Sequence, residues 1–189
     1  MDKGMRSIKQ TANSLTFTHV LGSEIGYAYV LERVYTVKEN KLYVAHTLRN
    51  TGKKRITTET YSHNFMQFDF GTYGPGYSLE FLNSTIDTKN HKWVTPKRVK
   101  INDKSIDIIA EFPDYTPTFG MMDVHTSKGD FRLINRTTGQ SVTIEVDHKV
   151  SSFVAWMWQK AFSAEPRITI DVKPGKTAKW NYVYSFDCR

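Results

Sequence analysis

A histidine and an asparagine stand side by side in the segment Thr57 to Phe70, which otherwise alternates like a β-strand. His63 can give or accept a proton, Asn64 carries an amide, and Tyr61 lies two positions earlier. Polar groups of this kind are kept inside a sheet only when they find hydrogen-bond partners. Two interpretations are therefore open. His63 is either satisfied within the sheet or placed to act on a bound ligand.

A second group of residues suited to ligand binding lies nearer the C-terminus and contains Trp156, Trp158 and Glu165. Glu165 precedes Pro166, which favours an extended backbone, and we expect a strand to start directly after it. Indole rings stack on the apolar face of a pyranose and carboxylates bind hydroxyl groups, so this group suits a sugar. Core packing of the tryptophans and an exposed turn position for the glutamate are the alternatives.

Other kinds of site find little support in the sequence. The six histidines form no His-x-His or His-Glu-x-x-His pair, and the single cysteine, Cys188, cannot build a cysteine-rich metal site. Gly74-Pro75-Gly76 has no following lysine of the kind a phosphate loop needs, and no Gly-x-Ser-x-Gly motif is present. We therefore expect neither a metal nor a cofactor.

Short alternating segments must position these side chains, because no segment keeps a helical apolar stripe over three turns. The pattern predicts an all-β protein, a sandwich of mostly antiparallel sheets. A length of 189 residues, 39% of them hydrophobic, suits one domain over residues 1–189. The polar stretch Thr85 to Val94 is expected to be an exposed loop. The predicted strands are residues 15–20, 27–37, 42–48, 57–70, 78–82, 99–101, 105–112, 131–134, 141–146, 153–158, 167–172 and 179–186.

The charge distribution narrows the choice of partners. The formal net charge is +7, but the basic residues fall in short groups at predicted turns, such as Lys53-Lys54-Arg55. Such groups are typical of strand ends that discourage edge-to-edge pairing, so we expect no nucleic-acid partner. No apolar run approaches the roughly 18 residues of a membrane span, which predicts a soluble protein without a membrane partner. Without a leader in the sequence as it stands, a cytoplasmic location is expected, or a periplasmic or secreted one if a signal was removed.

The order of several segments resembles the aldose 1-epimerase (galactose mutarotase-like) superfamily. The segments are Leu-Tyr-Val-Ala-His-Thr-Leu-Arg-Asn-Thr-Gly, then Ile-Thr-Thr-Glu-Thr-Tyr-Ser-His-Asn-Phe, then Ala-Glu-Pro, and finally Pro-Gly before an aromatic last strand. The resemblance covers residues 27–186 and implies a galactose mutarotase-like supersandwich. It implies a short form, because members of the family carry further N-terminal strands with another active-site histidine and a sugar-binding arginine.

The mechanism that this resemblance implies uses one acid and one base. A glutamate takes the proton of the anomeric hydroxyl while a histidine protonates the ring oxygen; the ring opens, the C1–C2 bond rotates, and closure gives the other anomer. His63 in Ser-His-Asn matches the acid and Glu165 in Ala-Glu-Pro matches the base. The residues expected to bind the sugar are Asn64, Tyr61, Trp156, Trp158 and, if its strand lies beside that of His63, His19.

Two further interpretations stay open. The first is a non-catalytic carbohydrate-binding sandwich, accessory to glycan metabolism, with Trp156, Trp158 and the loop Gly71 to Tyr77 as its platform. The second is a basic sandwich with a protein or nucleic-acid partner, which predicts steep salt dependence of binding. The pattern specifies neither the sugar nor an oligomeric state.

Overall fold

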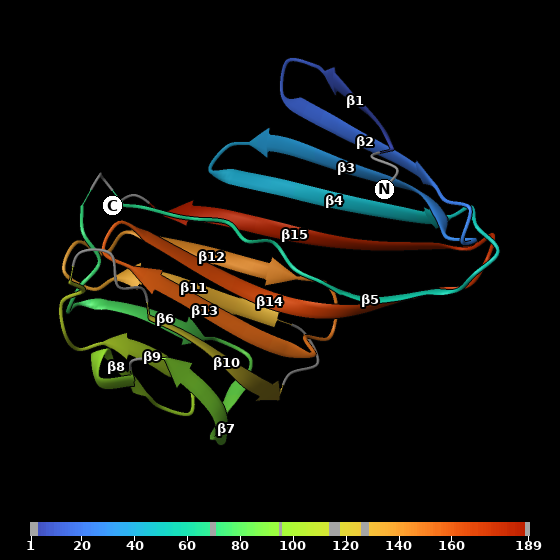
Figure 1. Ribbon diagram of the computed structural model, residues 1–189. Helices are drawn as coiled ribbons and strands as arrows, with labels where there is room; N and C mark the ends of the chain where they lie inside the picture. Colours follow the sequence, from blue (N-terminus) through green and yellow to red (C-terminus); the bar gives the residue numbers. More distant parts are fainter. Residues whose placement is uncertain (1–3, 69–70, 95, 114–117, 126–128, 188–189) are drawn as a thin grey trace. The chain divides into compact units, whose positions relative to one another are not determined.

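The computed structural model describes residues 4–68, 71–94, 96–113, 118–125 and 129–187 (Figure 1). Apart from one turn of 3-10 helix, η1 (Pro96–Arg98), the regular elements of these ranges are β-strands, and the strand pairs resolved in register are antiparallel. The predicted all-β class is confirmed. The chain divides into two compact units: unit 1 is Met1–Thr60 with Thr169–Ser185, and unit 2 is Tyr61–Ile168 with Phe186–Arg189. The single domain over residues 1–189 stays a prediction.

Unit 1 is built on five neighbouring antiparallel strands, which Figure 1 shows side by side. Short turns join the first four, and a positive φ of 54° at Glu39 closes the hairpin between the third and fourth where the sequence predicts a turn. In spatial order the strands are β1 (Met5–Gln10), β2 (Ser14–Gly22), β3 (Ala28–Lys38), β4 (Lys41–Asn50) and β15 (Thr177–Asp187).

The packed part of unit 1 lies on one face of β4 and β15. Val44, His46 and Leu48 alternate along β4 and are buried, and the His46 ring stacks on Trp180 of β15 with centroids 4.8 Å apart. The short strand β5 (Ile56–Thr60) is the neighbour of β14 (Ala161–Val172). The burial of alternate residues along β4 is what a strand with one covered face requires.

Unit 2 contains two sheets. One has the order β12 (Ser141–Val146), β11 (Gly129–Asn135), β6 (Tyr77–Phe81), β9 (Ser105–Ile108) and β8 (Val99–Ile101). The other has the order β14, β13 (Ser152–Trp158), β10 (Thr118–His125) and β7 (Thr85–Val94).

A cluster of aromatic side chains joins the two sheets of unit 2. Phe153 of β13 lies 5.0 Å from Phe81 of β6 and 4.6 Å from Phe131 of β11, measured between ring centroids. All three side chains are buried, as are Leu79 and Leu133 beside them. Two sheets that share such an apolar layer form a β-sandwich, as the sequence predicts.

One prediction about an individual strand is wrong, and two strands were not predicted. Thr85 to Val94 is strand β7 and not a loop; because it is the outermost strand of its sheet, its polar residues are tolerated there. Strand β1 was not predicted, since all its residues are exposed and mostly polar. Strand β10 was not predicted either, because Gly120 and Asp123 are weak strand formers and interrupt its alternation.

The predicted strand from Thr57 to Phe70 ends at Thr60, and its residues 69–70 lie outside the described ranges. The segment beyond Thr60 nevertheless stays alongside β14, and Met66 forms a bridge with Phe162 through hydrogen bonds of 2.8 and 3.1 Å. Backbone N–H groups alternate between the two edges of a strand, so the nitrogens of Phe162 and Pro166 lie on the same edge of β14, the edge that bonds Met66. Proline has no N–H to donate, so the regular ladder is interrupted opposite Ser62.

In these described ranges we find no helix of the length and apolar character that a membrane span requires.

Candidate active site

Three alternate side chains of the segment after β5 lie against the face of β13 and β14 within unit 2. Tyr61 contacts Arg167, His63 contacts Glu165, and Phe65 contacts Trp156. The first two contacts and the Met66–Phe162 bridge fit one antiparallel register, because residue numbers rise along the segment by as much as they fall along β14. His63 and Glu165 are therefore cross-strand neighbours, although they are 102 positions apart in the sequence.

Nδ1 of His63 and Oε1 of Glu165 are in direct hydrogen-bond contact. A carboxylate only accepts, so the imidazole donates through Nδ1 and presents Nε2 on its other side. The Glu165 side chain is 3% exposed, whereas that of His63 is 46% exposed. A buried carboxyl group thus contacts a solvent-facing imidazole, and such a pair can transfer a proton.

Glu165 is buried because β14 is covered on both faces around it. Phe162 and Ala164 face the apolar interior, while Ser163 and Glu165 are covered on the opposite side. The sequence predicted Glu165 at the start of a strand, but the structure places it in the middle of β14. A proline in mid-strand is tolerated here because its missing donor lies on the interrupted edge.

Aromatic rings surround the pair on the side of β13. The Phe65 ring is 4.3 Å from that of His63 and 5.0 Å from that of Trp156, both in edge-to-face arrangements. The ring of Trp156 is 6.2 Å from the imidazole. Phe65 is 53% exposed, so an apolar ring faces solvent directly beside the titratable pair. This geometry suits the apolar face of a sugar ring.

The segment that carries His63 is anchored by a buried tyrosine. The hydroxyl of Tyr73 donates to the carbonyl oxygen of Met66 at 2.8 Å, and its backbone N–H donates to the carbonyl of Gln159 at 2.7 Å. Burial raises the pKa of Tyr73 above its ordinary value of 10.0. Tyr73 is 1% exposed, so this part of the Gly71 to Tyr77 loop packs into the interior.

The structure places the remaining predicted residues as follows. Asn64 is exposed next to His63, and Trp158 lies in β13 two positions beyond Trp156, hence on the same face. His19 lies in β2 of unit 1, where its Nδ1 is 3.3 Å from the hydroxyl of Tyr29. His63, Glu165, Tyr61 and Trp156 are thus brought together within one unit.

Two residues of this site were not identified from the sequence. Phe65 belongs to the aromatic run after the His-Asn pair, and Arg167 follows Glu165 by two positions, which is the spacing of one strand face. The guanidinium carbon of Arg167 lies 4.5 Å from the centre of the Tyr61 ring.

Within the ranges that the structure describes, no three histidine, cysteine or acidic side chains are grouped so that they could hold a metal ion.

Comparison with solved structures identifies the fold. A galactose mutarotase related enzyme from Lactobacillus acidophilus superimposes with a TM-score of 0.67 and 12% identity, covering 96% of this chain and 71% of that chain. A putative aldose 1-epimerase from Escherichia coli K12 gives a TM-score of 0.68 and 13% identity, covering 98% of this chain and 69% of that chain. This chain has the galactose mutarotase-like fold.

An aldose epimerase homologue from C. elegans shares this galactose mutarotase-like fold, with a TM-score of 0.65, 14% identity, and coverage of 97% of this chain and 68% of that chain. The chain spans 66% to 71% of the length of these and a further neighbour. No protein-family model matches the sequence, and no curated protein matches it significantly. The resemblance noted from the sequence is confirmed at the level of the fold.

Proposed function

We propose that this chain acts on a free aldose as an aldose 1-epimerase, with His63 and Glu165 as its acid and base. The observation that carries the proposal is the contact between a solvent-facing imidazole and a buried carboxylate beside Phe65 and Trp156. The galactose mutarotase-like fold is consistent with this assignment, and the proton chemistry itself is argued from the pair.

The reaction needs one proton to leave the sugar and another to reach it. Glu165 takes the proton of the anomeric hydroxyl as the C1–O5 bond breaks, and protonated His63 gives its proton to O5. The open aldehyde rotates about its C1–C2 bond. Closure on the other face returns both protons, so the pair ends as it began. Each such transfer contributes on the order of 10²- to 10⁴-fold.

The resting contact requires one movement before a sugar can reach both groups. His63 covers Glu165, so the imidazole must turn toward solvent, where 46% of its side chain already lies. The carboxylate then exchanges its bond with the imidazole for a bond with the sugar hydroxyl. Catalytic hydrogen bonds commonly form only in the complex, so a resting contact of this kind is compatible with catalysis. Phe65 and Trp156 offer the ring a stacking surface beside the pair.

The test is anomer exchange of freshly dissolved α-D-glucose and α-D-galactose, followed by polarimetry. We expect acceleration by the wild-type chain and at least a hundredfold loss of that acceleration in both His63→Ala and Glu165→Gln. His148→Ala is the matched control, because His148 also contacts a carboxylate, Asp147 at 2.6 Å, in the same unit but on an exposed surface. No acceleration for either sugar, or equal acceleration in all variants, would reject the proposal.

A second function is a sugar-binding sandwich without turnover. The burial of Glu165 beneath His63 favours it, because a base that stays covered cannot take a proton from a ligand. Calorimetry that detects sugar binding, together with unchanged anomer exchange, would decide for this alternative. Substitution of Phe65 by serine should then weaken binding, while His63→Ala should not.

A further inference from the structure

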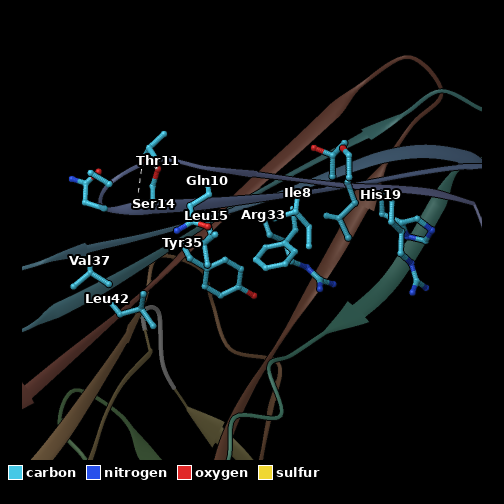
Figure 2. A pocket seen from close by; sticks show the side chains of 17 residues that line it. Ile8, Gln10, Thr11, Ser14, Leu15, His19, Arg33, Tyr35, Val37 and Leu42 are labelled. Carbon is cyan, nitrogen blue, oxygen red and sulfur yellow. Dashed lines mark hydrogen bonds between the residues drawn. The ribbon is translucent and has the colours of Figure 1, made fainter.

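A groove of about 1010 Å³ lies on one face of unit 1, over strands β1, β2, β3 and the start of β4 (Figure 2). Its side chains come from alternate positions, such as Ile8, Phe17 and Arg33, which are cross-strand neighbours. The volume is that of a site for a small organic ligand. All the residues that line it belong to unit 1.

The two ends of the groove differ in chemistry. Arg6 and His19 are cross-strand neighbours at one end, and Arg33 lies two residues further along the groove, opposite Phe17. Val37 and Leu42 lie at the other end, as Figure 2 shows.

An apolar surface joins these two ends. Ile8 is 66% exposed and Val37 is 59% exposed, while the rings of Phe17 and Tyr35 lie edge to face between them, with centroids 5.5 Å apart. The groove is therefore basic at one end, and from there an apolar strip runs beside the polar side chains of the turn between β1 and β2.

The charge of the basic end is not balanced by the groove itself. No aspartate or glutamate is found among the described residues that line it. Glu32, the acidic residue of β3 next to Arg33, points to the opposite face of the sheet, because side chains alternate along a strand. Two guanidinium groups and one imidazole at the same end favour an anionic ligand group.

The polar side chains at the other end come from the last residue of β1, the turn after it and the first residue of β2: Gln10, Thr11, Asn13 and Ser14. The hydroxyl groups of Thr11 and Ser14 at this end bond to each other at 2.6 Å. A sugar needs hydrogen-bond partners along its whole length, whereas an alkyl chain needs only apolar contact. From Arg33 to Val37 the strand advances about 13 Å, at about 3.3 Å per residue, which is close to the length of a chain of about ten carbons.

We propose that this groove binds a medium-chain fatty acid. Its carboxylate lies between Arg6, Arg33 and His19, and its alkyl chain runs over Phe17 and Tyr35 toward Val37. No covalent step is involved. The proposal is independent of sugar chemistry, since it uses no residue of the His63 site.

The test is calorimetry of the whole chain with hexanoate, octanoate and decanoate below the concentrations at which they form micelles. Because the groove is open on one side, each added methylene should be about half buried and should tighten binding about twofold. Decanoate should then bind roughly 16-fold tighter than hexanoate. Decanol, which lacks the charge, should bind about tenfold more weakly than decanoate.

Arg6→Gln combined with Arg33→Gln should weaken decanoate binding about tenfold and leave decanol binding unchanged. The matched control is Arg49→Gln, because Arg49 is an exposed arginine of β4 that does not line the groove. Thermal melts of all variants establish that they fold. Failure of decanoate to bind, equal affinity for hexanoate and decanoate, or equal loss in the Arg49 control would overturn the proposal. So would binding of oligogalacturonate in place of decanoate, which would identify an acidic glycan as the ligand.

Discussion

The contact between His63 and Glu165 predicts that the two single substitutions have unequal effects on stability. His63→Ala removes the hydrogen-bond donor of a carboxylate that is 3% exposed while the imidazole covers it. Leaving a buried acceptor unsatisfied costs about 1–3 kcal/mol, and a buried charge lies at the upper end of that range or beyond it. Glu165→Gln keeps the shape and an acceptor oxygen for the imidazole but removes the charge. We therefore expect a loss of about 2–3 kcal/mol for His63→Ala and less than about 1 kcal/mol for Glu165→Gln.

The loss of the imidazole ring as a packing group accounts for only part of the first value. The ring is 46% exposed, and its best apolar contact is the edge-to-face arrangement with Phe65 at 4.3 Å. Such a contact contributes about 0.5–1.5 kcal/mol. Once the carboxylate has been neutralised, removing the imidazole should cost no more than this. The double variant should accordingly be more stable than the sum of the single effects predicts, by about 1 kcal/mol or more.

Urea unfolding followed by tryptophan fluorescence measures all four proteins of this cycle. The relevant transition is that of unit 2, which contains both residues and Trp156, whose ring is 6.2 Å from the imidazole. The slope of free energy against urea must stay constant across the variants for the comparison to hold. Equal losses in the two single variants, or effects that simply add, would refute the conclusion that Glu165 depends on His63 while it is buried.

Three further predictions concern other parts of the structure. Tyr73→Phe removes the hydrogen bond to the Met66 carbonyl and should cost about 1 kcal/mol in urea unfolding. Because burial raises the pKa of Tyr73, the wild-type chain should also lose stability as the pH rises above 10.0, and the phenylalanine variant should lose less in alkaline melts. The hydrogen bond from Arg55 lowers the pKa of Asp171 below 3.8, so the stability that this ion pair contributes is present above pH 3.8 and is lost as the pH falls below it. In acid melts, Arg55→Gln should reduce the loss of stability with falling pH, and high salt should weaken the contribution of the pair. Phe153→Ala should cost about 3–5 kcal/mol in urea unfolding, because this ring is fully buried between both sheets of unit 2.

Much of the strand arrangement was predictable because it depends on local pattern. The alternation of apolar residues from Leu42 to Leu48 indicates which face of β4 is covered. Glu39-Asn40, between two predicted strands, indicates where the hairpin turns. These features need no knowledge of distant partners. The failures at β1 and β7 have the opposite cause. An outermost strand has few side chains to bury, so its composition resembles that of a loop although its backbone is paired.

The candidate residues of the site could be named from the sequence, but their arrangement could not. His63 stood out as half of a polar pair in a predicted strand and Glu165 as a carboxylate near two tryptophans, while their acid and base roles came from the resemblance. That they touch depends on the register between two segments about a hundred positions apart, which local pattern does not encode. Pro166 illustrates the same limit. From the sequence, Pro166 indicates an extended backbone for Glu165. Its second effect, the missing N–H opposite Ser62, becomes visible only once the segment and β14 are paired.

This interrupted ladder also bears on the choice between the two proposed functions. A regular strand would hold His63 with backbone hydrogen bonds on each side, and turning its ring would then have to occur against a fixed backbone. The bridge at Met66 holds the segment at one end, with bonds of 2.8 and 3.1 Å, while Pro166 has no N–H to donate to Ser62 opposite it. Residues near an interrupted ladder open at lower free energy than residues within one. The uncovering of Glu165 that epimerase activity would require therefore lies beside a position where one backbone donor is missing, and for this reason we favour catalysis over binding alone.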